Sequence, residues 1–206
     1  MLSNFSISKE NINFYLNELS KEIKRLSEKG TKIELILVGG ASVILNYTFR
    51  NSSSDLDGYY QSDILKQAIL NIADKLDLPN AWLNNDFIKT ASFSPKIIQY
   101  SKFYKEFNNC LSVRTVEGKY LVAMKLVSFR KYKNDISDIV GIISSESIAY
   151  DQIMEAIVNL YGNTEIVNLE ALEFIKELCT SSNLQDKYKN VKKKELETRQ
   201  NLKNKH

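Results

Sequence analysis

The sequence predicts an α+β fold in which a small domain with a mixed β-sheet precedes a helical half. Up to residue 117, segments with the three-to-four spacing of apolar residues in helices alternate with short apolar runs typical of strands. After Gly118 only the helical spacing remains. We therefore expect an α+β domain over residues 1–117, a helical domain over 118–183, and a basic tail, helical or disordered, over 184–206.

The expected elements of the first part rest on periodicity and on residues that begin or end helices. The first helix has Ser8 available as its cap and Gly30 as its end, whereas Pro79 and Pro95 interrupt the later pattern. The elements are a helix over 9–29, a strand over 33–38, a helix over 41–47, a brief strand over 55–60, a helix over 64–76, a strand that could form over 96–101, and a half-buried strand from 111. The helical half should contain helices over 120–129, 136–143, 148–160 and 169–178.

The composition of the 206 residues excludes several kinds of protein. The only histidine is His206, the last residue, which argues against a histidine-dependent catalytic triad, general base or metal cage. No apolar run approaches the roughly 20 residues that a spanning helix needs. The N-terminal residues lack the features of a signal peptide, so we expect a cytoplasmic protein that does not act at a membrane.

The formal net charge of +3 is unevenly distributed. Residues 184–206 contain eight Lys or Arg against three Asp or Glu, whereas the rest of the chain is slightly acidic. The tail could be a solvated helix end, or it could bind the phosphates of RNA. The sequence leaves both interpretations open.

The segment from residue 36 to 60 carries the pattern most indicative of chemistry. Gly39 and Gly40 lie where a strand turns into a helix, and backbone N–H groups at such a start can bind phosphate. Asp55 and Asp57 follow on a second strand, where residues two apart project to one face. Paired carboxylates favour a bound cation, and Mg²⁺ is the natural candidate, with Mn²⁺ as an alternative.

Each of these features has a purely structural alternative. An Asp-x-Asp pair or a Gly-Gly pair alone is common in surface turns, and the order and spacing of the two favour a functional pair. Lys125 could be a solvated lysine on a helix flank, and Asp135 and Asp138 could simply favour the positive end of a helix. Arg50 and Arg114 could pair with the aspartates or with phosphate.

These motifs together resemble a known superfamily. The stretch from Ile36 to Ser42, then Arg50, then Ser53 to Asp57 is similar to the glycine-pair and Asp-x-Asp signature of polymerase-beta-like nucleotidyltransferases. The stretch from Leu121 to Leu126, followed by Arg130 and by Asn134 to Ile139, resembles the second half of the AbiEii-type toxin family. The resemblance spans about residues 33 to 143.

The resemblance implies a role for individual residues. Gly39, Gly40, Arg50 and Lys125 would bind the nucleotide phosphates. Asp55 and Asp57 would bind magnesium. The catalytic set would be these two aspartates together with Lys125 and Asp138, the acid of the second half.

The expected function is a magnesium-dependent nucleotidyltransferase that moves a nucleoside monophosphate from an NTP onto RNA, with tRNA as one candidate. It would act as a toxin in a toxin–antitoxin or phage-defence setting and have a cognate antitoxin protein. Two alternatives stay open: a small-molecule, antibiotic-type nucleotidyltransferase, and a non-catalytic binding protein on a degenerate fold. The last is motivated by Gly40, where many members have serine, and by the lack of an acid in 96–101 and 111–116.

Overall fold

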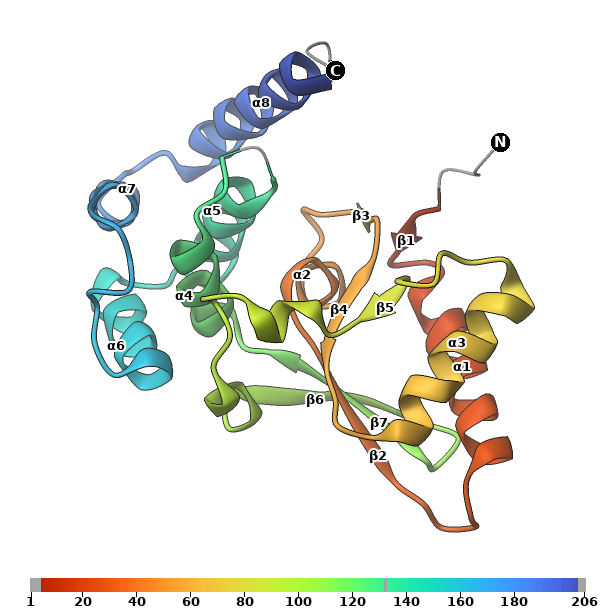
Figure 1. Ribbon diagram of the computed structural model, residues 1–206. Coiled ribbons are helices and arrows are strands. Elements are labelled where there is room, and N and C mark those ends of the chain that lie inside the picture. Colours follow the sequence, from red (N-terminus) through yellow and green to blue (C-terminus); the bar gives the residue numbers. More distant parts are fainter. Residues whose placement is uncertain (1–4, 132, 204–206) are drawn as a thin grey trace. The chain divides into compact units, whose positions relative to one another are not determined.

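The computed structural model describes residues 5–131 and 133–203, which form two compact units (Figure 1). The first unit contains residues up to Ile88 together with Ser101–Val116, and the second contains Lys89–Tyr100 together with the chain from Glu117. The first holds a mixed sheet and the second is helical, so the predicted α+β class is confirmed. His206 lies outside the described residues.

The main sheet of the first unit has five strands in the order β5-β4-β2-β7-β6. The strands are β2 (Ile33–Leu37), β4 (Leu56–Tyr59), β5 (Leu83–Asn84), β6 (Ser101–Phe107) and β7 (Leu111–Val116). β2 pairs antiparallel with β4 and parallel with β7, so the sheet is mixed as expected. A separate antiparallel pair joins β1 (Ile7–Ser8) to β3 (Ser52–Ser53).

Two amphipathic helices, α1 (Ile12–Leu26) and α3 (Asp63–Leu76), pack against each other and against one face of this sheet. The prediction that Ser8 caps the first helix is wrong, because α1 begins after Asn11. The side chain of Asn11 instead accepts a hydrogen bond from the Ser8 N–H, 2.7 Å away. The apolar stripes of both helices cover this face of the sheet.

The short helix α2 (Gly39–Asn46) begins two residues earlier than expected, on the glycine pair itself. Ser42 ties this helix to the sheet: its buried hydroxyl donates to the carbonyl of Leu37 (2.6 Å) and accepts from the N–H of Val116 (3.1 Å). The start of α2 is therefore fixed at the end of β2.

The expected strand over 96–101 is wrong. The segment instead forms a 3-10 helix, η2 (Pro95–Ile98), which Ser94 caps. Pro95 favours a helix here because proline suits the first turn of a helix and has no N–H to donate in a strand. The strand β6 begins only at Ser101, and its exposed Lys102 and Phe103 lie on an edge of the sheet. A second 3-10 helix, η1, spans Asp86–Lys89.

The second unit is built around α4 (Gly118–Ser128), which is buried on nearly all sides. It packs against α5 (Asp135–Glu146), α6 (Tyr150–Tyr161) and α7 (Leu169–Cys179). The basic segment forms a continuous helix, α8 (Leu184–Lys203), which packs against α5. None of the helices in the described part of the chain is both long and apolar enough to cross a membrane.

Candidate functional site

Of the two aspartates of the Asp-x-Asp motif, Asp57 lies on the side of β4 that faces away from the apolar core, and Asp55 directly precedes the strand. Leu56 is fully buried and Gly58 is buried, whereas Asp55 and Asp57 are half-buried, as the two-residue period of a strand requires. The carbonyl of Asp57 accepts a hydrogen bond from the N–H of Val38 (2.9 Å), which holds it beside the end of β2. Asp57 thus projects to the polar side of β4, whereas Asp55 lies in the bend before β4 and not on the strand that the sequence predicted over 55–60.

Gly39 brings the start of α2 up to the Asp57 carboxylate. Its φ of +51° lies in the left-handed region that favours glycine. A Cβ atom added there would lie 3.3 Å from Asp57 Oδ2. Because the first N–H groups of a helix lack partners within the helix and carry partial positive charge, an anion could bind here next to the Asp57 carboxylate.

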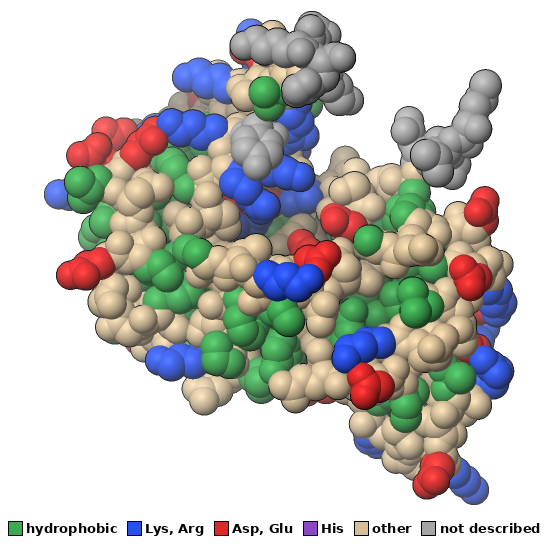
Figure 2. Space-filling view, viewed as in Figure 1, with side chains coloured by type: hydrophobic (Ala, Val, Ile, Leu, Met, Phe, Trp, Pro, Cys, Tyr) green, Lys and Arg blue, Asp and Glu red, His purple; other side chains and the backbone are tan. Residues whose placement is uncertain are grey.

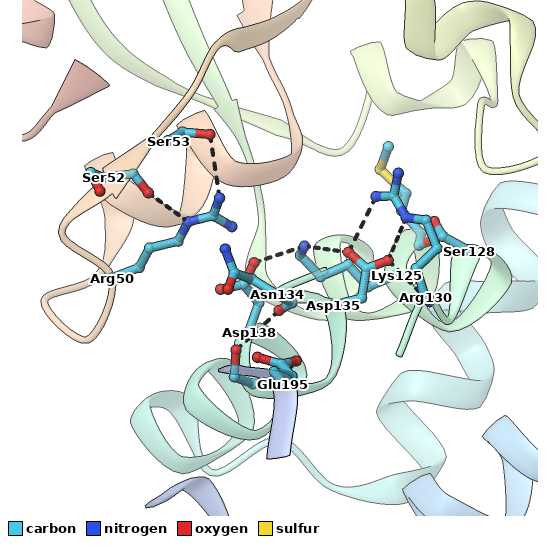
Figure 3. A network of polar contacts seen from close by, with 12 residues as sticks. Arg50, Ser52, Ser53, Lys125, Ser128, Arg130, Asn134, Asp135, Asp138 and Glu195 are labelled. Atoms are coloured by element: carbon cyan, nitrogen blue, oxygen red, sulfur yellow. Dashed lines mark hydrogen bonds and ion pairs between the residues drawn. The ribbon is translucent and has the colours of Figure 1, made fainter. Parts of the chain in front are cut away.

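Gly40 leaves room for the guanidinium of Arg50. A Cβ atom at Gly40 would lie 2.5 Å from Arg50 Nη2 and 2.9 Å from Ser53 Oγ. Arg50 is held there by hydrogen bonds from its Nε to the carbonyl of Ser52 (3.2 Å) and from its Nη2 to Ser53 Oγ (3.3 Å), as drawn in Figure 3. The glycine pair and Arg50 therefore form one cationic, hydrogen-bonding surface.

The second arginine left open by the sequence lies elsewhere. Arg114 on β7 donates from its Nε to Ser101 Oγ (2.8 Å) and lies 3.8 Å from Glu34 Oε2. The structure thus places Arg50, and not Arg114, against the glycine pair.

The donor set of this region fits a magnesium ion that also contacts substrate. Among residues 5–131 and 133–203 no group of three or more His, Cys, Asp or Glu side chains could enclose a metal. Mg²⁺ is usually held by one or two carboxylates and completed by water and substrate phosphates. Asp57 beside the start of α2, with Asp55 two residues before it, offers one or two such carboxylates.

The strand next to β4 carries an amide opposite Asp57. Asn84 on β5 is the register partner of Asp57. Its Oδ1 accepts from the N–H of Asp86 (3.0 Å), and its Nδ2 donates to the carbonyl of Ala81 (3.2 Å). Sequence reasoning missed Asn84 because it expected no strand at this point, and two residues carry too little pattern to show one.

In the second unit, Lys125 is buried and paired with two carboxylates. Only 6% of the residue is exposed, and its Nζ lies 3.1 Å from Asp135 Oδ1 and 2.8 Å from Asp138 Oδ2 (Figure 3). The interpretation of Lys125 as a solvated lysine is wrong, because α4 is covered on nearly all sides and this side chain lies against the start of α5. Asp135 and Asp138 are buried too, so they do more than favour a helix end.

Asp135 is paired with two cations. Arg130 Nε donates to its Oδ2 (2.8 Å), in addition to the contact with Lys125. Burial raises the pKa of Asp135, but the charges of Lys125 and Arg130 outweigh burial and bring its pKa below the ordinary value. Asp135 is therefore ionised at neutral pH.

The C-terminal helix adds a carboxylate to the same place. Glu195 on α8 is 2% exposed, and its Oε1 accepts a hydrogen bond from the backbone N–H of Ser137 (2.9 Å). Burial raises the pKa of Glu195, and hydrogen bonds from Ser137 and the charge of Arg199 offset this only in part. The one sequence signal for Glu195 is that it is an acid within a run of lysines.

The comparisons with known proteins identify a family but no individual relative. Neither a curated protein nor a solved structure matches the chain. A family model described as "Nucleotidyltransferase of unknown function (DUF6036)" matches residues 15–197, a span that includes the glycine pair, the Asp-x-Asp motif, Lys125 and Asp138. This match confirms the predicted nucleotidyltransferase likeness, while the AbiEii-type subfamily stays a prediction. The chain therefore belongs to this family of nucleotidyltransferases of unknown function.

Proposed function

We propose that the protein transfers a nucleoside monophosphate from an NTP to an acceptor hydroxyl in a magnesium-dependent reaction. One observation carries the proposal: the Asp57 carboxylate lies against the glycine start of α2, 3.3 Å from the position of a Gly39 Cβ. A metal-binding acid and a phosphate-binding helix start are thereby brought together. The family match supports the reaction class.

The chemistry follows from what each group can do. The acceptor oxygen forms a bond to the α-phosphorus, the bond from that phosphorus to the bridging oxygen breaks, and pyrophosphate leaves. In the proposal, the N–H groups of α2 and Arg50 bind the phosphates, while Asp55 and Asp57 hold the cation and orient the acceptor hydroxyl, whose proton passes to one of these two carboxylates. A bound magnesium ion would neutralise charge on the phosphate oxygens.

The second unit contributes Lys125 and Asp138 to the proposal. Two carboxylates fix the position of the Lys125 ammonium, 2.8 Å from Asp138 Oδ2. A cation held in one place stabilises developing charge without first reorganising. We assign Lys125 to the phosphates and Asp138 to holding Lys125 in place.

RNA is the acceptor that the charge distribution supports best. Lys189 and Lys193 on α8 have side chains that are 76% and 78% exposed, and Lys194 is exposed as well. Figure 2 shows Lys and Arg side chains at the place of α8. Exposed lysines along one helix suit the regular phosphates of a nucleic acid, and tRNA is one candidate.

A toxin role, in a toxin–antitoxin or phage-defence system, completes the proposal and rests on the likeness to AbiEii-type toxins. Induced synthesis of the protein should arrest growth, and synthesis of the Asp57→Asn variant should not. Growth arrest by both proteins at equal levels would contradict a toxic activity at this site. Relief of the arrest by the product of an adjacent gene would identify the cognate antitoxin.

The reaction itself is tested by incubating labelled NTPs with RNA and magnesium. The wild type should label RNA, Asp57→Ala should not, and Asp74→Ala should label it fully, because Asp74 is an exposed acid of α3 outside the motif. Equal labelling by wild type and Asp57→Ala would contradict the proposed mechanism.

The acceptor is tested on α8 without removing the helix, because truncation would also remove the buried Glu195. Replacing Lys189, Lys193 and Lys194 by glutamine should weaken RNA binding and flatten its dependence on salt. The matched control replaces three exposed lysines outside α8, which are Lys24, Lys102 and Lys176. Unchanged RNA labelling by the α8 variant would contradict α8 as the acceptor surface, and labelling of a small molecule alone would favour the antibiotic-type alternative.

A further inference from the structure

The first turn of α5 is capped from outside by α8. Asn134 occupies the N-cap position, yet its side chain makes no capping hydrogen bond. Its Oδ1 instead accepts from Nη2 of Arg199 on α8. The capping acceptor comes from Glu195, whose Oε1 accepts from the N–H of Ser137, 58 residues away in sequence.

The capped turn is the one that holds Lys125. Asp135 lies two residues before Ser137 and Asp138 directly follows it, and both contact Lys125 Nζ. Residues within one turn of a helix move together because their backbone hydrogen bonds link them. The position of Ser137 is therefore coupled to that of the Lys125 and Asp138 pair.

Burying the Glu195 carboxylate between α8 and α5 costs folding free energy. Its Oε2 is buried and has no hydrogen-bond partner among the described residues, and Arg199 Nη2 lies 3.8 Å from it. A carboxylate oxygen buried in this way costs free energy that a solvated acid would not. Meanwhile Leu196 and Leu202 of the same helix remain 51% and 44% exposed. This end of α8 therefore leaves two leucine side chains exposed while it buries a carboxylate.

We propose that Glu195 is a positioning residue for Lys125 and Asp138 in the second unit, a role that rests on the proposed nucleotidyl transfer. By capping α5 from α8, it sets the turn that carries Asp135 and Asp138, and through them the ammonium of Lys125. It touches neither nucleotide nor acceptor. In this proposal the basic helix α8 positions the first turn of α5. Its exposed lysines are then held at a fixed place relative to Lys125.

The kinetic test compares Glu195→Ala, Glu195→Asp and Glu195→Gln in the full chain, with Glu197→Ala as the matched control on the same helix. Glu197 is a half-exposed acid whose side chain is 55% exposed. Removing or withdrawing the capping oxygen in Glu195→Ala and Glu195→Asp should lower kcat by about 10- to 100-fold, with the KM for NTP within about 2-fold of wild type. Glu195→Gln keeps the acceptor and should restore kcat, and Glu197→Ala should not differ from wild type.

Two kinetic outcomes would overturn the proposal. A kcat in Glu195→Asp and Glu195→Ala equal to that of Glu197→Ala would show that the cap does not act on the site. A Glu195→Gln variant as slow as Glu195→Ala would show that the charge acts rather than the capping oxygen. Glu195→Asp serves as the informative variant if Glu195→Ala does not fold.

Amide hydrogen exchange separates this proposal from the proposed function, since it needs no activity. The first-turn amides of α5 should exchange faster in Glu195→Ala and Glu195→Asp than in wild type, and at the wild-type rate in Glu195→Gln. Unchanged protection in the first two variants would overturn the coupling. Absence of nucleotidyl transfer in the wild type would reject the proposed function, while the exchange rates would still decide the role of Glu195.

Discussion

The candidate site residues of the first unit and those of the second unit differ in how they carry charge. In the first unit, Asp55 and Asp57 are half-buried, and Asp57 lies on β4 next to the glycine pair, which has no side chains. In the second unit, Lys125, Asp135 and Asp138 are buried and paired with one another. The first arrangement suits groups that receive a ligand, whereas the second suits a charge that must stay in one place.

The difference has an energetic consequence. Removing one partner of a buried ion pair leaves an uncompensated charge and is strongly destabilising. Removing a half-exposed carboxylate costs little stability, because water already shares its solvation. Substitutions in the first unit should therefore act on activity, and those in the second should act on stability as well.

The largest expected effect is on activity, in Asp57→Asn. The substitution keeps the shape of the side chain and removes the charge that holds the cation, so nucleotidyl transfer should fall by about 100- to 1000-fold. The midpoint of chemical denaturation should stay at the wild-type value. Initial rates with saturating NTP and magnesium measure the first quantity, and urea titration measures the second.

Asp74→Asn is the control for this variant, because Asp74 is an exposed acid of α3 in the same unit. It should transfer nucleotide at the wild-type rate. If Asp57→Asn lost stability as well as activity, this would contradict the expectation that substitutions in the first unit change activity alone.

The next effect is on stability, in Lys125→Met. Methionine fills the space of the lysine stem but leaves Asp135 and Asp138 buried without their shared cation, so the free energy of unfolding should fall by about 3–5 kcal/mol. Urea denaturation followed by circular dichroism measures it. Lys176→Met on α7 replaces an exposed lysine and should change stability by less than about 0.5 kcal/mol. A similar loss in both variants would contradict the buried ion-pair network.

A smaller effect is expected in Gly40→Ala. The added Cβ would lie 2.5 Å from Arg50 Nη2 and must displace the guanidinium, so the KM for NTP should rise by about 10-fold. Gly30→Ala is the control, because a Cβ there meets nothing within 4 Å and adds only the strain of a positive φ. Steady-state kinetics with varied NTP measures the change, and an unchanged KM in Gly40→Ala would remove Arg50 from the phosphate surface.

The smallest effect is a pH-dependent gain in stability in Glu195→Gln. Because burial raises the pKa of Glu195 in the folded protein, the folded state holds this proton more tightly than the unfolded chain does. Wild-type stability should therefore decline as the pH rises above the ordinary glutamate pKa of about 4.3, and the variant should lack this decline. Thermal unfolding should show a higher midpoint for Glu195→Gln at neutral pH and equal midpoints in acid, and the opposite order would contradict a buried charge.

The sequence reveals the first part of the site better than the second, for a physical reason. The glycine pair and the Asp-x-Asp motif depend on local rules, namely the start of a helix and the two-residue period of a strand. The pairing of Glu195 with Ser137 joins residues 58 apart and leaves no periodic trace. Lys125 is misread as solvated because the burial of α4 depends on the helices that surround it.

The prediction of the fold from the sequence is limited in the same way. The α+β class and most helices follow from periodicity, whereas the edge strand β6 does not, because its exposed Lys102 and Phe103 blur the alternation. Asn84 lies opposite Asp57 only through the pairing of β4 with β5, which the sequence does not encode locally. Contacts between distant segments thus account for what sequence reasoning missed.

The central claim is tested most directly by following label from the α-phosphate and from the γ-phosphate of NTP into RNA, with wild type and Asp57→Asn side by side. The wild type should incorporate the α-label in a magnesium-dependent reaction and none of the γ-label, and the variant should do so at a rate reduced by about 100-fold or more. Incorporation of the γ-label, or α-label transfer that is equal in both proteins, would contradict nucleotidyl transfer at Asp57.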